Sequence, residues 1–153
     1  MTLPRSPALF VLATLAISLA SPAHAAAPTG HYVVSGTGTV FDTKSKLTWQ
    51  QGGSLGTFAE AKAYCGQVGS TLGGAGWRLP TFKELLTLLD LSQTKNSTSD
   101  LKIDPVFPYT GIGGHWSATP DAADPSRAWN VNFFYGDTYT YGVTNTNAIR
   151  CVR

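Results

Sequence analysis

The stretch Gly76-Trp77-Arg78-Leu79-Pro80-Thr81-Phe82-Lys83-Glu84-Leu85 carries the densest structural information in the sequence. Thr81 stands where a helix N-cap belongs, and Glu84 follows three residues later, which is the spacing of a capping box. Pro80 keeps the residue before it extended, so the helix starts only after the proline. The stretch therefore predicts a loop with an inward tryptophan, followed by a buried helix over 82–91.

A second capping box lies upstream, at Thr57 and Glu60, and predicts another helix. Its apolar residues recur at spacings of three and four, which is typical of an amphipathic helix. They are Phe58, Ala61, Cys65 and Val68. Cys65 is therefore expected to face the core. Four glycines within 69–76 predict a tight loop between the two helices.

β-rich segments flank the helices on both sides. The predicted strands are 31–34, 39–42, 47–50, 115–119, 128–134, 138–143 and 149–152, with a loop over 51–56. Residues 92–104 are polar and irregular, and 106–109 is expected to pack on the core as an apolar plug. This order predicts an α+β fold, with two helices packed on small antiparallel sheets and a long irregular loop region.

Residues 1–25 have the features of a secretory signal peptide. A charged start is followed by an apolar run over 8–20 and by the small-x-small sequence Ala23-His24-Ala25. The apolar run is too short to cross a bilayer, and no later segment approaches the roughly 18 to 20 apolar residues that a membrane span requires. We therefore predict an exported protein, which is secreted, periplasmic or on the cell surface.

The predicted mature chain consists of a lead-in with the first strand, 26–37, and a single domain, 38–153. The whole sequence has 11 basic and 9 acidic residues, and Arg5 is the only charged residue of the signal. This near balance gives no electrostatic footprint for nucleic acid or for an anionic membrane.

Cys65 and Cys151 are the only two cysteines. An exported chain meets an oxidising compartment, so we predict that they form a disulfide bond. The alternative is a reactive or metal-binding thiol pair. Neither cysteine lies in a CxxC motif or beside a histidine, which disfavours that alternative.

Taken together, motifs spread over the chain resemble the C-terminal domain family of the Legionella collagen-like adhesin. The residues that carry the resemblance are Asp42, Leu47-Thr48-Trp49-Gln50, Ala61, Tyr64-Cys65, Gly76-Trp77-Arg78-Leu79-Pro80-Thr81, Glu84-Leu85, Phe107-Pro108, Trp116-Ser117, Ala128-Trp129, Val131, Phe133, Gly136 and Arg150-Cys151-Val152-Arg153. The resemblance covers about 38–153.

What the resemblance implies is a C-type-lectin-like fold, in which a disulfide joins the first helix to the last strand. Cys65 and Cys151 match those two positions. The adhesin that gives the family its name is associated with binding of sulfated glycosaminoglycans and with trimer formation. Because a fold does not determine a function, an adhesin role for this chain is an expectation by analogy.

Three tyrosines are the first candidates for ligand contact. Tyr139 and Tyr141 share a strand face, with Tyr135 just before them, and tyrosine offers sugars both a flat apolar ring and a hydroxyl group. The alternative is that these rings pack in the core or at a subunit interface. Asn130 and Asn132 are expected to point outward on the same sheet, where they contact ligand or only solvent.

Basic residues give a second candidate surface. If the fold brought them together, Arg78, Lys83, Arg127, Arg150 and Arg153 would bind an anion through several directed hydrogen bonds. For Arg78 the favoured role is a structural salt bridge or backbone hydrogen bond. The motif Trp77, Arg78, Pro80, Thr81 and Glu84 is accordingly assigned to architecture.

No metal or cofactor is predicted. Calcium-dependent lectins of this broad fold carry Glu-Pro-Asn or Gln-Pro-Asp in a loop and Trp-Asn-Asp on a strand. Here Thr119-Pro120-Asp121 and Trp129-Asn130-Val131 leave too few of the oxygen ligands that calcium requires. Asp121 and Asp124 remain as metal candidates, although two aspartates in a proline-bounded loop are commonly turn residues.

The residues available for catalysis are few. His31 and His115 are the histidines outside the predicted signal, and the spacing of His115 and Ser117 lacks the sequence context of a known nucleophile. We therefore predict a noncatalytic, lectin-like module that binds a glycan or another extracellular ligand. The alternative is a structural or protein-interaction subunit of the cell envelope that assembles with an envelope protein or as a homo-oligomer. An enzyme is the third alternative.

Overall fold

The computed structural model describes residues 27–92, 101–108 and 114–153, which form two sheets and three helices. The strands are β1 (Tyr32–Ser35), β2 (Thr39–Asp42), β3 (Thr48–Gln50), β4 (Ser54–Gly56), β5 (His115–Pro120), β6 (Arg127–Asn132), β7 (Asp137–Gly142) and β8 (Asn147–Ile149). The helices are α1 (Phe58–Gln67), α2 (Gly69–Leu72) and α3 (Phe82–Leu86). The predicted signal peptide and Tyr109 lie outside the described residues.

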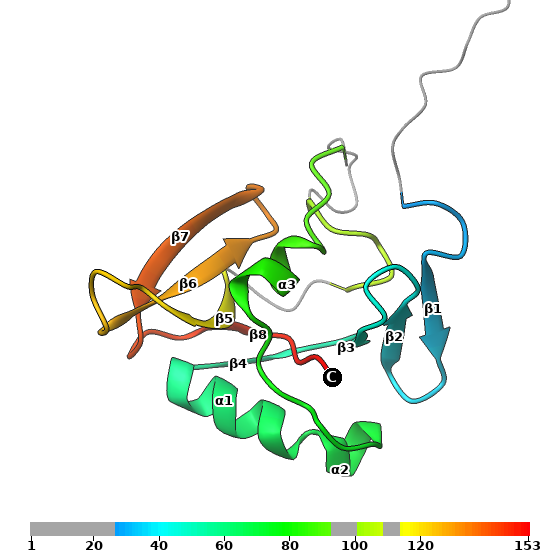
Figure 1. The fold of residues 1–153 in the computed structure, drawn as a ribbon, viewed down its shortest axis with the longest axis horizontal. Helices are drawn as coiled ribbons and strands as arrows, with labels where there is room; N and C mark the ends of the chain where they lie inside the picture. Colours follow the sequence, from blue (N-terminus) through cyan, green and yellow to red (C-terminus); the bar gives the residue numbers. More distant parts are fainter. Residues whose placement is uncertain (1–26, 93–100, 109–113) are drawn as a thin grey trace, which may run out of the picture.

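The two sheets differ in size and are built from different strands. Strands β1, β2 and β3 form an antiparallel sheet in that order, and the larger sheet has the order β4-β8-β5-β6-β7. Only the contact of β5 with β8 is parallel. Figure 1 shows α3 between the two sheets, with α1 and α2 below the larger one. The predicted α+β class is confirmed.

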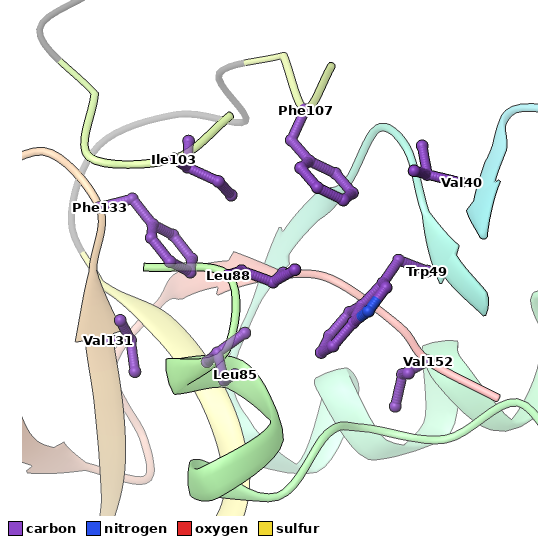
Figure 2. Packing of buried hydrophobic residues seen from close by; sticks show 9 residues of the cluster. All are labelled: Val40, Trp49, Leu85, Leu88, Ile103, Phe107, Val131, Phe133 and Val152. Carbon is purple, nitrogen blue, oxygen red and sulfur yellow. The ribbon is translucent and has the colours of Figure 1, made fainter. Parts of the chain in front are cut away.

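The first core cluster fills the space between the two sheets. Trp49 from β3, Leu85 from α3 and Val131 from β6 are each 0% exposed. Phe107, from the segment between α3 and β5, is 1% exposed. Figure 2 shows these side chains converging from separate elements. The predicted apolar plug is therefore confirmed for Phe107.

The second core cluster lies between α1 and the larger sheet. Trp116 of β5, Ala61 of α1 and the two cysteines are fully buried in it, and Trp77 is 6% exposed. A disulfide joins Cys65 to Cys151, as predicted, and links α1 to the residues that follow β8. The loop over 73–80 therefore delivers its tryptophan inward.

Both predicted capping boxes are present. The side chains of Thr57 and Thr81 accept hydrogen bonds from the backbone N–H groups of Glu60 and Glu84. In turn, each glutamate carboxylate accepts a hydrogen bond from the backbone N–H of its cap residue. These reciprocal bonds satisfy backbone donors that a helix start leaves unpaired. The helix start predicted from the opening stretch is therefore correct.

The predicted end of that helix is wrong, because α3 stops at Leu86. Thr87 Oγ1 donates to the Glu84 carbonyl, and the backbone then leaves the helix in tight turns. Leu89 forms an antiparallel bridge with Ile103 instead of continuing the helix. Pairing with a segment distant in sequence thus overrides the local apolar pattern.

Two smaller predictions also need correction. The segment 69–76 is not only loop, because it begins with the short helix α2. The predicted loop over 51–56 contains strand β4, in which Leu55 lies opposite Ala148 of β8. Within the described residues, no helix is long and apolar enough to cross a membrane.

Candidate ligand-binding surface

The candidate tyrosines lie on the β6–β7 hairpin, at one edge of the larger sheet. Tyr139 lies opposite Asn130 and Tyr141 opposite Ala128, so the two tyrosines share a face of the sheet. Their rings meet edge to face, with centroids 5.9 Å apart. Tyr141 is 40% exposed, and Tyr139 is half-buried. The hairpin thus presents an aromatic pair at a solvent-accessible edge.

Two more aromatic side chains occupy the turn of the hairpin. Tyr135 is 72% exposed and Phe134 is 39% exposed, and their rings also meet edge to face. Asn132 Oδ1 accepts hydrogen bonds from the backbone N–H groups of both residues, at 2.9 Å for Phe134 and 3.3 Å for Tyr135. This side-chain turn fixes the backbone that presents both rings. We call Phe134, Tyr135, Tyr139 and Tyr141 the aromatic edge.

Phe134 was missed in the sequence because the strand over 128–134 was predicted to include it. In the structure β6 ends at Asn132, and Phe134 belongs to the turn. An asparagine followed by aromatic residues and by Gly136 is the local signal for such a turn. Gly136 has a φ of 78°, which favours glycine at that position.

Asn130 and Asn132 do not point into solvent, which corrects the expectation for both. Asn130 is 0% exposed and Asn132 is 5% exposed. The face of β6 that they share with Ala128 is covered, because Trp116 of β5 lies beside it and α1 packs above it. Asn132 therefore acts on the aromatic edge by holding its turn.

Asn130 of β6 is the cross-strand partner of Tyr139 of β7. Its Nδ2 donates to the Ala128 carbonyl at 3.1 Å, whereas its buried Oδ1 has no hydrogen-bond partner among the described residues. The Tyr139 hydroxyl lies close to Gly114, where an added Cβ would be 2.8 Å from it. Burial raises the pKa of Tyr139, which therefore stays neutral at physiological pH.

Arg127 is not on the face of the two tyrosines. It alternates with Ala128 along β6, so it shares the opposite face with Thr140. Arg127 Nε donates to Thr140 Oγ1 at 2.9 Å, and Nη2 donates to the Thr140 carbonyl. The candidates from β6 and β7 thus divide between the two faces of the hairpin.

Two of the five residues considered for an anion-binding patch, Arg150 and Arg78, are engaged in structural contacts. Arg150 is 1% exposed and donates to backbone carbonyl groups. Arg78 forms an ion pair with Glu84, which confirms its expected structural role. Arg153 lies over the Trp77 ring, 5.3 Å from its centroid. Burial and local pairing therefore use these guanidinium groups in the architecture.

The loop aspartates behave as turn residues. Asp121 Oδ1 accepts a hydrogen bond from the Ala123 N–H at 2.9 Å. Asp124 Oδ1 accepts from the backbone and hydroxyl of Ser126, and these bonds lower its pKa. Among the residues that the structure describes, no group of three or more His, Cys, Asp or Glu could hold a metal ion.

His115 and Ser117 lie inside the sheet. Burial, and secondarily the charge of Arg150, hold the pKa of His115 well below its ordinary value. The His115 ring packs edge to face on Phe133, and Ser117 Oγ donates to the Trp129 carbonyl at 2.8 Å. Both residues therefore serve the packing of β5 against β6.

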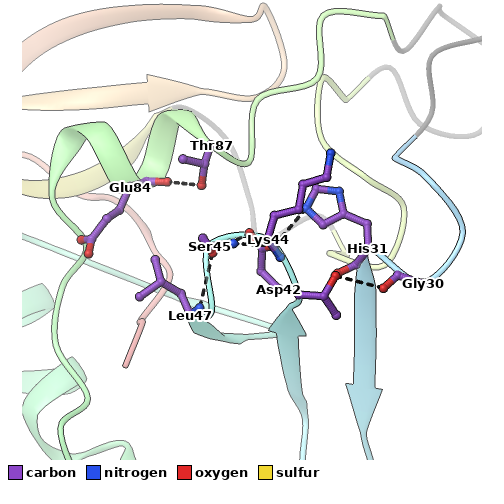
Figure 3. Close-up of polar contacts among 9 residues, drawn as sticks. Gly30, His31, Asp42, Lys44, Ser45, Leu47, Glu84 and Thr87 are labelled. Carbon is purple, nitrogen blue, oxygen red and sulfur yellow. Dashed lines mark hydrogen bonds and ion pairs between the residues drawn. The ribbon is translucent and has the colours of Figure 1, made fainter.

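A cavity of about 350 Å³ lies between the start of β1 and the segment after α3. Its lining includes His31, Tyr32, Asp90 and Asp104. Figure 3 shows how this corner is tied down: His31 Nε2 contacts Asp42 Oδ1 at 2.9 Å, and Asp42 also accepts bonds from the turn that follows it. None of the candidate tyrosines lines this cavity.

A smaller cavity, of about 290 Å³, lies beside α1 and α2. Tyr64 and Gln50 line it together with side chains of both helices, and Gln50 Nε2 donates to Tyr64 Oη at 2.7 Å. Lys62, Trp77 and Arg78 line a third cavity of about 310 Å³. None of the four residues of the aromatic edge lines any of these three cavities.

The family comparison covers most of the chain. The family model described as the Lcl C-terminal domain matches residues 38–153. The match begins within the β1–β2 turn and includes both core clusters and the aromatic edge. No curated protein matches the sequence.

Proposed function

Because the chain belongs to the Lcl C-terminal domain family, we propose that it is a noncatalytic, adhesin-like binding module of C-type-lectin-like fold. The family is not a known enzyme family and fits a secreted or surface-exposed protein. We propose further that the aromatic edge recognises a glycan or another extracellular ligand. The observation that carries this proposal is that three exposed aromatic residues, Phe134, Tyr135 and Tyr141, lie on one hairpin, with the half-buried Tyr139 ring packed against Tyr141.

The chemistry of the aromatic edge suits a neutral, partly apolar ligand. The C–H groups of a sugar ring pack on aromatic rings, and hydroxyl groups at the ring periphery can exchange hydrogen bonds with tyrosine. The two pairs come from a single hairpin, whose turn is held by Asn132. Their arrangement is thus largely preformed, which reduces the entropy lost on binding.

The first test is a glycan array probed with the exported protein, including neutral and sulfated polysaccharides. Binding should weaken about tenfold, or about 1.4 kcal/mol, for Tyr141→Ala. Tyr141→Phe separates the contribution of the ring from that of the hydroxyl. Leu55→Ala is the matched control, because Leu55 is 51% exposed on β4, at the other edge of the same sheet.

Two results would contradict the proposal. The first is a folded protein that binds no glycan and no extracellular protein. The second is a ligand whose affinity is changed equally by the tyrosine and the leucine substitutions. Circular dichroism of each variant separates loss of binding from loss of the fold.

A further inference from the structure

The outer edge of β1 has backbone groups that no described residue satisfies. Strand β1 is the terminal strand of the smaller sheet and pairs only with β2. The Thr43 N–H donates to the His31 carbonyl, which sets the alternation of hydrogen-bonded pairs along β1. Val33 therefore bonds to Phe41. The N–H and C=O groups of Tyr32 and Val34 point away from β2.

The side chains at this edge are apolar. Val33 and Val34 are 50% and 51% exposed, and Phe41, opposite Val33, is 38% exposed. Residues 27–41 contain no Asp, Glu, Lys or Arg, and 32–41 contain no proline. Natural edge strands are commonly protected by such residues against pairing with another strand. In Figure 1, β1 lies at the periphery, away from the larger sheet.

We propose that β1 pairs with β1 of a second copy of this chain, antiparallel and about a two-fold axis at Val33. In this register the N–H and C=O groups of Tyr32 bond to those of Val34 in the second copy, and the reciprocal bonds form by symmetry. All four outward groups of each strand are then satisfied. The two small sheets become one continuous sheet across the dimer.

The apolar side chains favour a second copy as the occupant. On the axis, Val33 faces Val33 as a non-hydrogen-bonded pair, whose Cα atoms are about 4.5 Å apart. This extends the exposed row formed by Val33 and Phe41 into the same row of the second copy. A two-fold interface requires such self-complementarity, and the uncharged edge offers no repulsion between copies.

The dimer is expected to be weak and dependent on concentration. One pair of four-residue strands buries less than the roughly 1,200 Å² of a standard specific interface. Sedimentation of the purified protein should therefore show its mass doubling as the concentration rises towards about 1 mM, the range of weak specific association. A mass that stays monomeric over this range would overturn the proposal.

Amide hydrogen exchange tests the register residue by residue. The amides of Tyr32 and Val34 should exchange rapidly in dilute solution and become protected as the dimer forms. The amide of Val33 is an internal control, because it bonds within the sheet in both states. Dimerisation without new protection of Tyr32 and Val34 would place the interface elsewhere. Protection of Tyr32 and Val34 that is independent of concentration would indicate that something other than a second copy covers the edge of β1. Either of these two results would contradict the proposal.

Disulfide trapping tests the axis. Val33→Cys should form an intermolecular disulfide, since the two native cysteines are already joined. Val34→Cys is the matched control, because it is equally exposed. In this register its two copies are offset by two residues along neighbouring strands, so their Cα atoms are about 8 Å apart. That exceeds the roughly 7 Å that a disulfide allows between Cα atoms. Equal trapping of both variants would refute the register.

A charge at the axis should abolish the dimer. Val33→Lys brings two like charges into direct opposition, whereas Leu55→Lys places the same charge at an equally exposed position on β4. We expect loss of the doubled mass for the first variant only. A dimer that persists in Val33→Lys, with the fold intact, would exclude β1 pairing.

Discussion

The guanidinium of Arg78 and the carboxylate of Glu84 form two hydrogen bonds, of 2.8 and 2.6 Å, at the entrance to α3. The same carboxylate accepts bonds from the backbone and hydroxyl of Thr81. Glu84 thus closes the capping box and also ties the incoming loop to the helix. These contacts lower the pKa of Glu84 to about 2. The hydrogen bond from Arg78 is the largest cause, and the bonds from Thr81 add to it.

This pKa predicts an acid-sensitive contribution to stability. The ordinary pKa of Glu84 is 4.5, so its contribution is complete above that pH and is lost as the pH falls through about 2. Glu84→Gln retains much of the capping box but removes the charge. We expect it to lower the free energy of unfolding at neutral pH by about 1 kcal/mol, because the arginine partner is partly exposed and screened.

Urea unfolding between pH 2 and pH 7 measures this effect as a difference between wild type and Glu84→Gln. The difference should shrink as the pH falls. Glu60→Gln is the control, because Glu60 holds the equivalent position in the capping box of α1 without an ion-pair partner among the described residues. A difference that does not change with pH would show that the charge of Glu84 contributes nothing.

The disulfide should be a large part of the total stability. The cysteines are 86 residues apart, and in the chain-entropy model a loop of that length destabilises the unfolded state by about 4 to 5 kcal/mol. Replacing both Cys65 and Cys151 by alanine should lower the free energy of unfolding by that order. Guanidinium unfolding of the oxidised protein and the double variant measures the difference. A change below about 1 kcal/mol would contradict this expectation.

Arg150 is predicted to be irreplaceable by lysine. Its Nη1 donates to the carbonyl oxygens of Gln50, Gln51 and Gly52, and Nη2 donates to that of Pro108. Burial lowers its pKa to about 9, so the guanidinium remains charged at neutral pH. A lysine ammonium cannot reproduce this planar set of donors, and buried carbonyl groups would lose their partners.

We therefore expect Arg150→Lys to lower the free energy of unfolding by about 2 to 4 kcal/mol. Arg153→Lys is the control, because Arg153 is exposed and its guanidinium lies over the Trp77 ring. Thermal and denaturant unfolding give the comparison. Similar, small effects of both substitutions would show that the carbonyl contacts of Arg150 are not stabilising.

Local chemistry explains which elements were predictable from the sequence. Thr57 and Thr81 stand three residues before their glutamates, and this spacing alone specifies both helix starts. Cys65 occupies an apolar position of α1, so its burial was also predictable. In contrast, α3 ends where Leu89 pairs with Ile103, and no short-range pattern reveals a partner at that distance.

Burial of polar residues was the least predictable feature of the candidate site. Side chains alternate along β6, so Asn130 lies on the other face of the strand from the core residue Val131. In a sheet with one solvated face, the asparagine would be exposed. Here the second face of the sheet is also covered, because Trp116 and α1 pack beside it. Arg150 is similarly hidden because backbone carbonyl groups from 50–52 converge on it. Both outcomes depend on tertiary packing.

Gly114 connects this packing to the aromatic edge. A Cβ added there would lie 2.8 Å from the Tyr139 hydroxyl and 2.9 Å from the Asn130 Cβ, so Gly114→Ala must displace one of them. Overpacking of this kind costs about 1 to 3 kcal/mol. We also expect weaker binding of whichever ligand the array identifies, because the Tyr139 ring is displaced.

Two further variants make this prediction specific. Gly66→Ala is the control, since an added Cβ meets nothing within 4 Å in α1 and should stabilise the helix by about 0.5 to 1 kcal/mol. Combining Gly114→Ala with Tyr139→Phe removes the closer of the two clashing atoms, so the double variant should be more stable than Gly114→Ala alone. Denaturant unfolding measures all of these changes. If Tyr139→Phe gives no recovery, the strain from Gly114→Ala falls on Asn130 and not on the aromatic edge.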